Sequence, residues 1–298
     1  MILALVAVVP VLLVLTGCGG GEVAGGTGPV GGRPLRVVAT TTHLTDFARV
    51  LGGGRAEILD LLPANVDPHD YEPTPADLET VRRADLVIKN GVGLDAWLEP
   101  TLKSAGSKAR VVDASAGVKL RRDDPHIWHD PTRARAMVAA VARAMREADP
   151  GNAAAYAEAE RAYAAELEAL DAEIRGQIDG LASKKLVTNH DAFGYYVERY
   201  GLDFVGSIIP SFDSQAELSS RDLSSLVARI RDQGVRAVFS ESSLPPKTAE
   251  TVAREAGVRV LAGEGALYGD TLGPPGSGAD TYLTMMRHNT RTIVEGLR

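Results

Sequence analysis

A long stretch without helix breakers in the middle of the chain constrains the fold more than any other feature. Between residues 153 and 178 the sequence has no proline and one glycine, Gly176, and alanine, glutamate, leucine and arginine dominate it. This composition predicts one helix of roughly 26 residues, about 39 Å long at a rise of about 1.5 Å per residue. A coiled coil is one interpretation of such a helix. Because its large apolar side chains cover one face over only a few turns, a helix packed across two lobes is favoured.

Short β-rich runs alternate with helical stretches on both sides of this helix, which predicts βαβ units and mostly parallel sheets. The predicted strands cover residues 35–41, 57–62, 85–89, 110–113, 185–188, 204–209, 235–240 and 258–261. The other predicted helices cover residues 45–51, 78–84, 94–104 (with Pro100 as a candidate interruption), 131–149, 192–200, 219–233, 246–256 and 281–297. We therefore expect an α/β fold in which two lobes are bridged by one long backbone helix. The N-terminal lobe is expected at residues 35–150, the linking helix at 151–180 and the C-terminal lobe at 181–298.

The first residues of the chain predict an export signal. Residues 1–16 carry no charge and are almost wholly apolar, but they are too few for a membrane-spanning helix of about 20 residues. They lead into LTGC, which resembles a bacterial lipobox, so we expect a signal peptide at 1–17 and lipidation of Cys18. The glycine-rich residues 18–34 then predict a flexible tether that holds an extracytoplasmic domain at the membrane. No lysine or arginine precedes the apolar run, which leaves open an unusual signal, a start further upstream, or an ordinary signal with an incidental cysteine.

Composition excludes several classes of function. Cys18 is the single cysteine, so an internal disulfide framework and a zinc site built on several cysteines are excluded. The formal net charge of −7 argues against a nucleic-acid partner. The sequence contains no GxxxxGK[ST] phosphate loop, no HExxH zinc helix and no GxSxG nucleophile elbow. The candidates for chemistry are therefore the histidines and the acids near them.

Three of the six histidines lie where strands give way to helices. His69 follows the strand at 57–62, His190 follows the strand at 185–188, and His126 precedes a helix. In open α/β sheets such loops gather at one rim, where ligands bind. Neutral imidazoles suit Zn²⁺, and a carboxylate can complete a tetrahedral site, for which Asp270 is the candidate in the second lobe. A single histidine is nevertheless more often a hydrogen-bonded structural residue than a metal ligand.

Four segments resemble, in the correct order, the cluster A-I (cluster 9) metal-binding solute-binding proteins of ABC transporters. The segments are DPHDYEPTPADL, DPHIWHDP, TNHDAFGYYVERYG and LYGDTLGPPG, and the resemblance covers roughly residues 35–298. It implies two α/β lobes joined by a rigid helix, with the metal between them. By motif match, the first two ligands come from the N-terminal lobe and the last two from the C-terminal lobe. These ligands are His69, His126, His190 and Asp270.

The resemblance implies a lipid-tethered bacterial receptor that captures Zn²⁺ as cargo and delivers it to an ABC permease. Manganese-type members commonly have a carboxylate where this chain has His190, so Mn²⁺ is the less favoured cargo. Four protein ligands leave no open position on the metal, which argues against an enzyme. A manganese receptor, an adhesin on the same fold, and a secreted zinc hydrolase with Asp270 as base are the alternatives. We expect a monomer, with a metallochaperone as a further candidate partner, and affinity that falls below about pH 6.5.

The chain departs from the zinc-type pattern in one loop and carries three further histidines. Many zinc-type members have a long histidine- and acid-rich loop before the second histidine motif, whereas residues 119–124 are short and contain no histidine. His129 is expected to support the ligands or the start of a helix, with direct ligation as the alternative. His43 is expected either to line the cleft or, preferably, to cap or pack a helix. His288 is expected to be structural or exposed.

Overall fold

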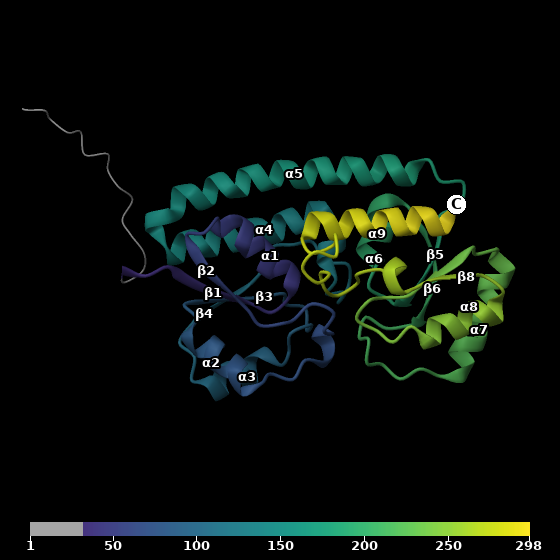
Figure 1. Ribbon diagram of the computed structural model, residues 1–298, viewed down its shortest axis with the longest axis horizontal. Helices are drawn as coiled ribbons and strands as arrows, with labels where there is room; N and C mark the ends of the chain where they lie inside the picture. Colours follow the sequence, from purple (N-terminus) through teal and green to yellow (C-terminus); the bar gives the residue numbers. More distant parts are fainter. Residues whose placement is uncertain (1–31) are drawn as a thin grey trace, which may run out of the picture.

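Two α/β lobes lie side by side beneath one long helix in the computed structural model, which describes residues 32–298 (Figure 1). The long helix α5, Ala153–Asp179, has 27 residues and runs along both lobes. It packs against α1 (Thr42–Gly52) and α4 (Pro131–Ala148) of the first lobe and against the C-terminal helix α9 (Tyr282–Leu297). The predicted long helix between two lobes is therefore confirmed, and it packs within its own chain.

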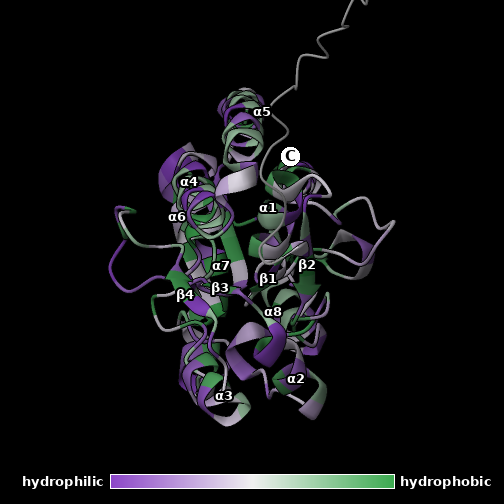
Figure 2. Ribbon diagram, turned by 90° about the vertical axis from the view of Figure 1, so that its left-hand side faces the viewer, coloured by the Kyte–Doolittle hydropathy of each residue, from purple (hydrophilic) through white to green (hydrophobic). Residues whose placement is uncertain are grey.

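The N-terminal lobe contains a four-stranded parallel sheet in the order β2-β1-β3-β4. Its strands are β1 (Leu35–Ala39), β2 (Ala56–Asp60), β3 (Leu86–Lys89) and β4 (Arg110–Asp113). Alternate residues of β1 point to opposite faces, so Val37 packs with the core under α1 and α4, whereas Val38 packs with α2 (Pro75–Arg83) and α3 (Leu98–Ala105). Helices cover both faces, and the strands between them are largely hydrophobic (Figure 2).

The C-terminal lobe has two pairs of parallel strands. The pairs are β5 (Lys185–His190) with β6 (Asp203–Ile209), and β7 (Ala237–Phe239) with β8 (Arg259–Leu261). The helices of this lobe, besides α9, are α6 (Gly194–Tyr200), α7 (Ser220–Gln233) and α8 (Lys247–Ala256). Every strand pairing in the described residues is parallel, which confirms the predicted α/β fold class.

Several element boundaries differ from the sequence prediction by a few residues, among them the start of α3 and the end of β5. Helix α3 begins at Leu98 rather than at residue 94, so Pro100 lies in its first turn, where a backbone N–H has no helical partner to lose. Strand β5 extends to His190, which pairs with Ile209, so this histidine ends a strand instead of lying on the loop after it. The 3₁₀ helices η2 (Pro68–Asp70) and η3 (Ile127–His129) are among the short elements that the sequence did not predict.

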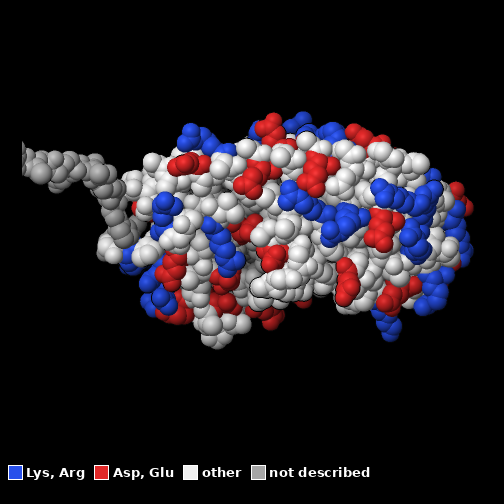
Figure 3. All heavy atoms as spheres, turned by 45° about the horizontal axis from the view of Figure 1, so that its top comes forward, with Lys and Arg blue, Asp and Glu red and all other residues white. Residues whose placement is uncertain are grey.

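Neither the N-terminal segment nor the distribution of surface charge indicates where a functional site lies. The predicted signal peptide, Cys18 and most of the tether lie outside the described residues. No helix among residues 32–298 combines the length and the apolar character needed to cross a membrane. Acidic and basic side chains are interspersed over the face that carries α5 (Figure 3), so the net negative charge is not concentrated there.

Candidate metal centre

The same Asp-Pro-His turn presents the first two histidines of the centre. Asp67 Oδ1 accepts a hydrogen bond from the backbone N–H of His69 at 2.9 Å, and Asp124 Oδ1 accepts one from that of His126 at 3.1 Å. Proline restricts φ in each turn, and the aspartate carboxylate binds the N–H two residues further on. The turn thus fixes each histidine locally, at η2 and just before η3.

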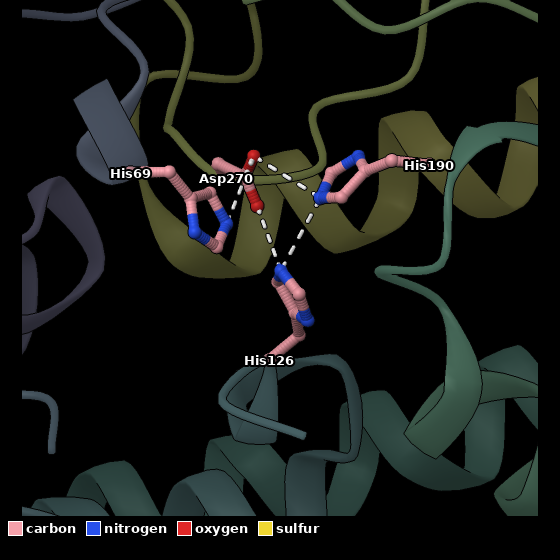
Figure 4. Close-up of side chains that lie close together, drawn as sticks. All are labelled: His69, His126, His190 and Asp270. Carbon is pink, nitrogen blue, oxygen red and sulfur yellow. Dashed lines mark hydrogen bonds and ion pairs between the residues drawn. The ribbon is translucent and has the colours of Figure 1, made fainter. Parts of the chain in front are cut away.

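Four side chains from distant parts of the chain converge between the lobes (Figure 4). His69 and His126 come from the N-terminal lobe, His190 ends β5, and Asp270 lies on the segment between β8 and α9. One ligand atom from each residue lies within 4.8 Å of the others. The structure therefore brings together all four residues that the motifs singled out.

The separations among His126, His190 and Asp270 match those expected around a tetrahedral metal. His126 Nε2 lies 3.2 Å from Asp270 Oδ1, and His190 Nε2 lies 3.4 Å from Asp270 Oδ2. The two Nε2 atoms of His126 and His190 are 3.3 Å apart. With metal–ligand bonds of about 2.0–2.1 Å, a tetrahedron has ligand–ligand distances of about 3.4 Å. His69 Nε2 is further away, at 3.9 Å from Asp270 Oδ2.

Two buried carboxylates set the orientation of the inner histidines. Asp124 Oδ1 is 2.8 Å from His126 Nδ1, and Glu241 Oε2 is 2.9 Å from His190 Nδ1. A carboxylate can only accept, so each Nδ1 carries a hydrogen and each Nε2 turns toward the centre. Both oxygens of Asp270 are buried without a hydrogen-bond partner. Facing nitrogen lone pairs and unpartnered carboxylate oxygens are the surroundings that a cation satisfies.

The same contacts shift the pKa values of the site. Burial opposes the charged form of His126, but the hydrogen bond with Asp124 and the nearby carboxylate of Asp270 outweigh burial and raise its pKa to about 9. Burial likewise opposes charge on His190, yet Glu241 and Asp270 raise its pKa well above the usual value. Burial alone would raise the pKa of Asp270, but the two histidines hold it well below its ordinary range. Without metal, protons on the imidazoles balance the carboxylates.

His69 differs from the other three residues in its surroundings. Its side chain is 8% exposed, whereas those of His126, His190 and Asp270 are fully buried. Burial lowers the pKa of His69. A cavity of about 450 Å³ lies beside His69 and is also lined by Trp97 and Phe212. The centre is therefore closest to solvent on the His69 side.

The remaining histidines lie outside the group of four. His129 is buried, donates from Nε2 to the Gly269 carbonyl oxygen at 2.9 Å, and has a pKa lowered to about 3, chiefly by burial. His43 stacks on Trp128 with ring centres 4.5 Å apart. His288 is partly buried and donates from Nε2 to a backbone carbonyl oxygen of the same lobe at 2.9 Å. The structure places His129 behind the ligand set, His43 behind Trp128, and His288 away from the centre.

Asp124 and Glu241 are site residues that the sequence reasoning did not assign. The repeated Asp-Pro-His motif was a local signal for Asp124, which also accepts a hydrogen bond from Arg121 at 3.1 Å. Glu241 has no such signal, because it meets His190 from 51 residues away. A side chain at Gly269 would collide with the Glu241 carboxylate, so glycine at this position leaves room for it.

Residues 37–296 match the family described as zinc-uptake complex component A, periplasmic (ZnuA). The chain is 32% identical over 295 residues to the manganese-binding lipoprotein MntA of Halalkalibacterium halodurans, covering 96% of this chain and 95% of the relative. It is 28% identical over 280 residues to the iron ABC transporter substrate-binding lipoprotein MtsA of Streptococcus pyogenes, covering 88% and 89%. It is 31% identical over 278 residues to the zinc-binding protein TroA of Treponema pallidum, covering 89% of each.

The fold also matches a solved structure. The periplasmic zinc-binding protein TroA from Treponema pallidum superposes with a TM-score of 0.81 at 29% identity, covering 89% of this chain and 99% of that one. The names of the relatives mention zinc, manganese and iron, so they identify a kind of receptor rather than one metal. The resemblance inferred from the four sequence motifs is confirmed. The chain belongs to the ZnuA family of periplasmic metal-binding receptors that serve ABC transporters.

Proposed function

We propose that this receptor binds one Zn²⁺ as cargo outside the cytoplasm and delivers it to an ABC permease for import. The ligands are three imidazoles and one carboxylate, from His69, His126, His190 and Asp270. The observation that carries the proposal is the pair of carboxylate-backed Nε2 atoms 3.3 Å apart, each near one oxygen of Asp270. A ligand set dominated by imidazole suits Zn²⁺ better than the harder Mn²⁺. Asp270 acts as a ligand rather than as the base of a hydrolase.

We also propose that the receptor is anchored through a lipid on Cys18. The LTGC sequence supports this anchor, as do the names of MntA and MtsA, which are called lipoproteins. A cleaved leader at 1–17 and a tether at 18–34 then precede an N-terminal lobe at 35–150. Mass spectrometry of the mature N-terminus tests the anchor. An unmodified Cys18 in membrane fractions would contradict it.

A manganese receptor is the second candidate, because the relative MntA is named manganese-binding and is 32% identical. The donor chemistry opposes it at one position. A carboxylate in place of His190 would suit Mn²⁺, but Glu241 already lies 2.9 Å from the His190 ring and would repel a second negative charge. The site as built therefore favours an imidazole there.

Metal analysis and competitive titration test the zinc proposal. The purified chain is stripped of metal, titrated with Zn²⁺, and then challenged with Mn²⁺ at increasing excess. We expect one Zn²⁺ per chain, retained against a large excess of Mn²⁺, and strongly weakened binding in His126→Ala and His190→Ala. Wild-type affinity in these variants would show that His126 and His190 are not metal ligands. Displacement of Zn²⁺ by equimolar Mn²⁺ would favour the second candidate.

A further inference from the structure

The segment that carries Asp270 changes its hydrogen-bonding partners just before the ligand. Up to Tyr268 it belongs to the C-terminal lobe. The N–H of Leu267 donates to the Ser240 carbonyl oxygen at 2.8 Å, next to β7. The N–H of Tyr268 donates to Asn289 Oδ1 on α9 at 2.9 Å. These bonds attach the segment to the C-terminal lobe as far as residue 268.

From Gly269 onward the partners lie in the N-terminal lobe. The Gly269 carbonyl oxygen accepts from Trp128 Nε1 at 3.0 Å and from His129 Nε2 at 2.9 Å. Two residues later, Thr271 Oγ1 accepts from the N–H of Asn65 at 3.1 Å. The N–H of Leu272 donates to Thr42 Oγ1 on α1 at 2.8 Å. The segment before α9, which lies between the lobes in Figure 1, is thus bonded to the first lobe on both sides of Asp270.

The start of α9 continues this attachment. The N–H of Tyr282 donates to Asp46 Oδ2 on α1 at 2.9 Å, and its hydroxyl donates to the Trp128 carbonyl oxygen at 2.6 Å. Trp128 therefore contacts the segment both before and after Asp270, through its indole and through its backbone.

The two donors to Gly269 are buried and packed against other rings. Trp128 and His129 are fully buried. His43 of the N-terminal lobe stacks on the Trp128 ring at 4.5 Å, and Phe193, just before α6 in the C-terminal lobe, packs on the His129 ring at 4.3 Å. The carbonyl group of Gly269 lies in the same peptide plane as the nitrogen of Asp270, so bonds to this oxygen orient the ligand's own backbone. Occupying both acceptor directions of the oxygen leaves that plane little freedom.

His190 is held quite differently. It ends β5, pairs with Ile209 of β6, and is backed by Glu241, so its strand pairing and the carboxylate behind its Nδ1 both belong to the C-terminal lobe. Chain order would divide the ligands equally between the lobes. The hydrogen bonds instead group Asp270 with the two histidines of the N-terminal lobe.

We propose that Trp128 and His129 are positioning residues that fix Asp270 to the N-terminal lobe, which makes His190 the one ligand carried by the C-terminal lobe. This inference rests on the proposed function, because it concerns how a proposed ligand is held. Its consequence is that separation of the lobes would remove His190 and leave a three-ligand half-site on the first lobe. Weakening the Gly269 contacts should then loosen Asp270 and speed metal loss.

The test compares His129→Leu, which removes one donor, with His129→Gln, which retains an N–H group. Trp128→Phe removes the other donor and keeps an aromatic ring against His43. His288→Leu is the matched control, since His288 donates to Ala266 of the same segment but on the C-terminal side of the change in partners. Zn²⁺ dissociation is measured by stopped flow with excess chelator. The metal-free proteins are compared by amide hydrogen exchange of residues 266–272.

We expect dissociation roughly five- to tenfold faster in His129→Leu and Trp128→Phe, in proportion to one lost hydrogen bond. His129→Gln should restore most of the wild-type rate, and His288→Leu should leave it unchanged. In an Asp270→Asn background, His129→Leu should add little further effect. Wild-type rates in both donor variants, or equal acceleration by His288→Leu, would overturn the inference.

Hydrogen exchange separates this inference from the proposed function. In metal-free His129→Leu, exchange should rise at residues 270–272 and stay unchanged at 267–268. Uniform exchange across the segment would refute the change of partners at Gly269. If the wild-type chain bound no Zn²⁺, the proposed function would fall, while the exchange pattern would still decide which lobe holds Asp270.

Discussion

Asp124 and Glu241 act on the centre through the histidines in front of them. Each accepts a hydrogen bond from an Nδ1 atom, at 2.8 Å for His126 and 3.1 Å for His190. A carboxylate in this position fixes the tautomer and orientation of the ring and makes its Nε2 a stronger electron donor. Both carboxylates are fully or almost fully buried, so their charges are poorly screened by solvent.

Removing either charge should weaken metal binding while leaving the ligands in place. We expect Asp124→Asn and Glu241→Gln each to lower Zn²⁺ affinity about 10- to 100-fold. Glu79→Gln is a charge-matched control, because Glu79 lies exposed on α2 and pairs with Arg82. Competition with a chelator of known affinity measures the effect. Affinities equal to that of the control would show that the two carboxylates do not support the ligands.

Metal affinity should depend on pH over a range above that of an ordinary histidine. The pKa of His126 is raised to about 9, and that of His190 is raised in the same direction. Zn²⁺ needs the neutral rings, so protons must leave, and affinity should fall about tenfold per pH unit for each proton displaced. The fall should begin near pH 9 rather than at the pH of about 6.5 expected from an unperturbed imidazole.

Calorimetry in two buffers with different ionisation enthalpies checks this prediction. At pH 7.5 at least one proton per Zn²⁺ should pass to the buffer, so the observed enthalpies should differ. Identical enthalpies would mean that the inner histidines are already neutral in the metal-free receptor.

At the scale of elements, two helical glycines have opposite surroundings. Gly176 is exposed on α5, and a Cβ there would meet no atom within 4 Å. Gly296 is buried near the end of α9, where a Cβ would collide with the Phe239 ring of β7. Gly176 only lowers the helix propensity of α5, whereas Gly296 permits close packing of α9 on the sheet.

Alanine substitutions should therefore change stability in opposite directions. Gly176→Ala should raise the free energy of unfolding by about 0.5–1 kcal/mol. Gly296→Ala should lower it by about 1–3 kcal/mol, because the added methyl group overpacks the contact with Phe239. Urea unfolding curves with unchanged slopes measure both effects. A stabilising Gly296→Ala would contradict the tight packing of α9.

Element types followed from local patterns, but some element ends did not. The absence of breakers predicted α5, and continuous apolar runs predicted the buried strands. The end of β5 at His190 depends on its pairing with Ile209, and the start of α3 at Leu98 depends on the turns that precede it. Pairing partners of this kind cannot be identified from a few neighbouring residues.

At the scale of the whole molecule, the ligands join two lobes that α5 and α9 already connect. A metal ion bound between the lobes stabilises the folded chain by mass action, since the unfolded chain has no assembled site. Zn²⁺ at 100 times its dissociation constant should add about 2.7 kcal/mol to the free energy of unfolding. His190→Ala should reduce this gain, because the C-terminal lobe then loses its ligand.

Differential scanning calorimetry with and without Zn²⁺ measures the gain, and excess chelator should reverse it. His288→Ala serves as the histidine control, since His288 lies outside the group of four. A melting temperature that does not respond to Zn²⁺ in the wild-type chain would contradict binding between the lobes.

The sequence by itself determined the α/β lobes, the long helix and the four candidate ligands, because each depends on spacing or on a motif within a few residues. Only the tertiary structure decided which residues hydrogen-bond to those ligands or to the backbone beside them. Glu241 reaches His190 from 51 residues away, and His129 reaches Gly269 from 140 residues away. The packing of whole lobes decides which of these residues meet, because polar groups that become buried must find a hydrogen-bond partner. For the same reason chain order assigned Asp270 to the C-terminal lobe, whereas its neighbouring hydrogen bonds join it to the N-terminal one.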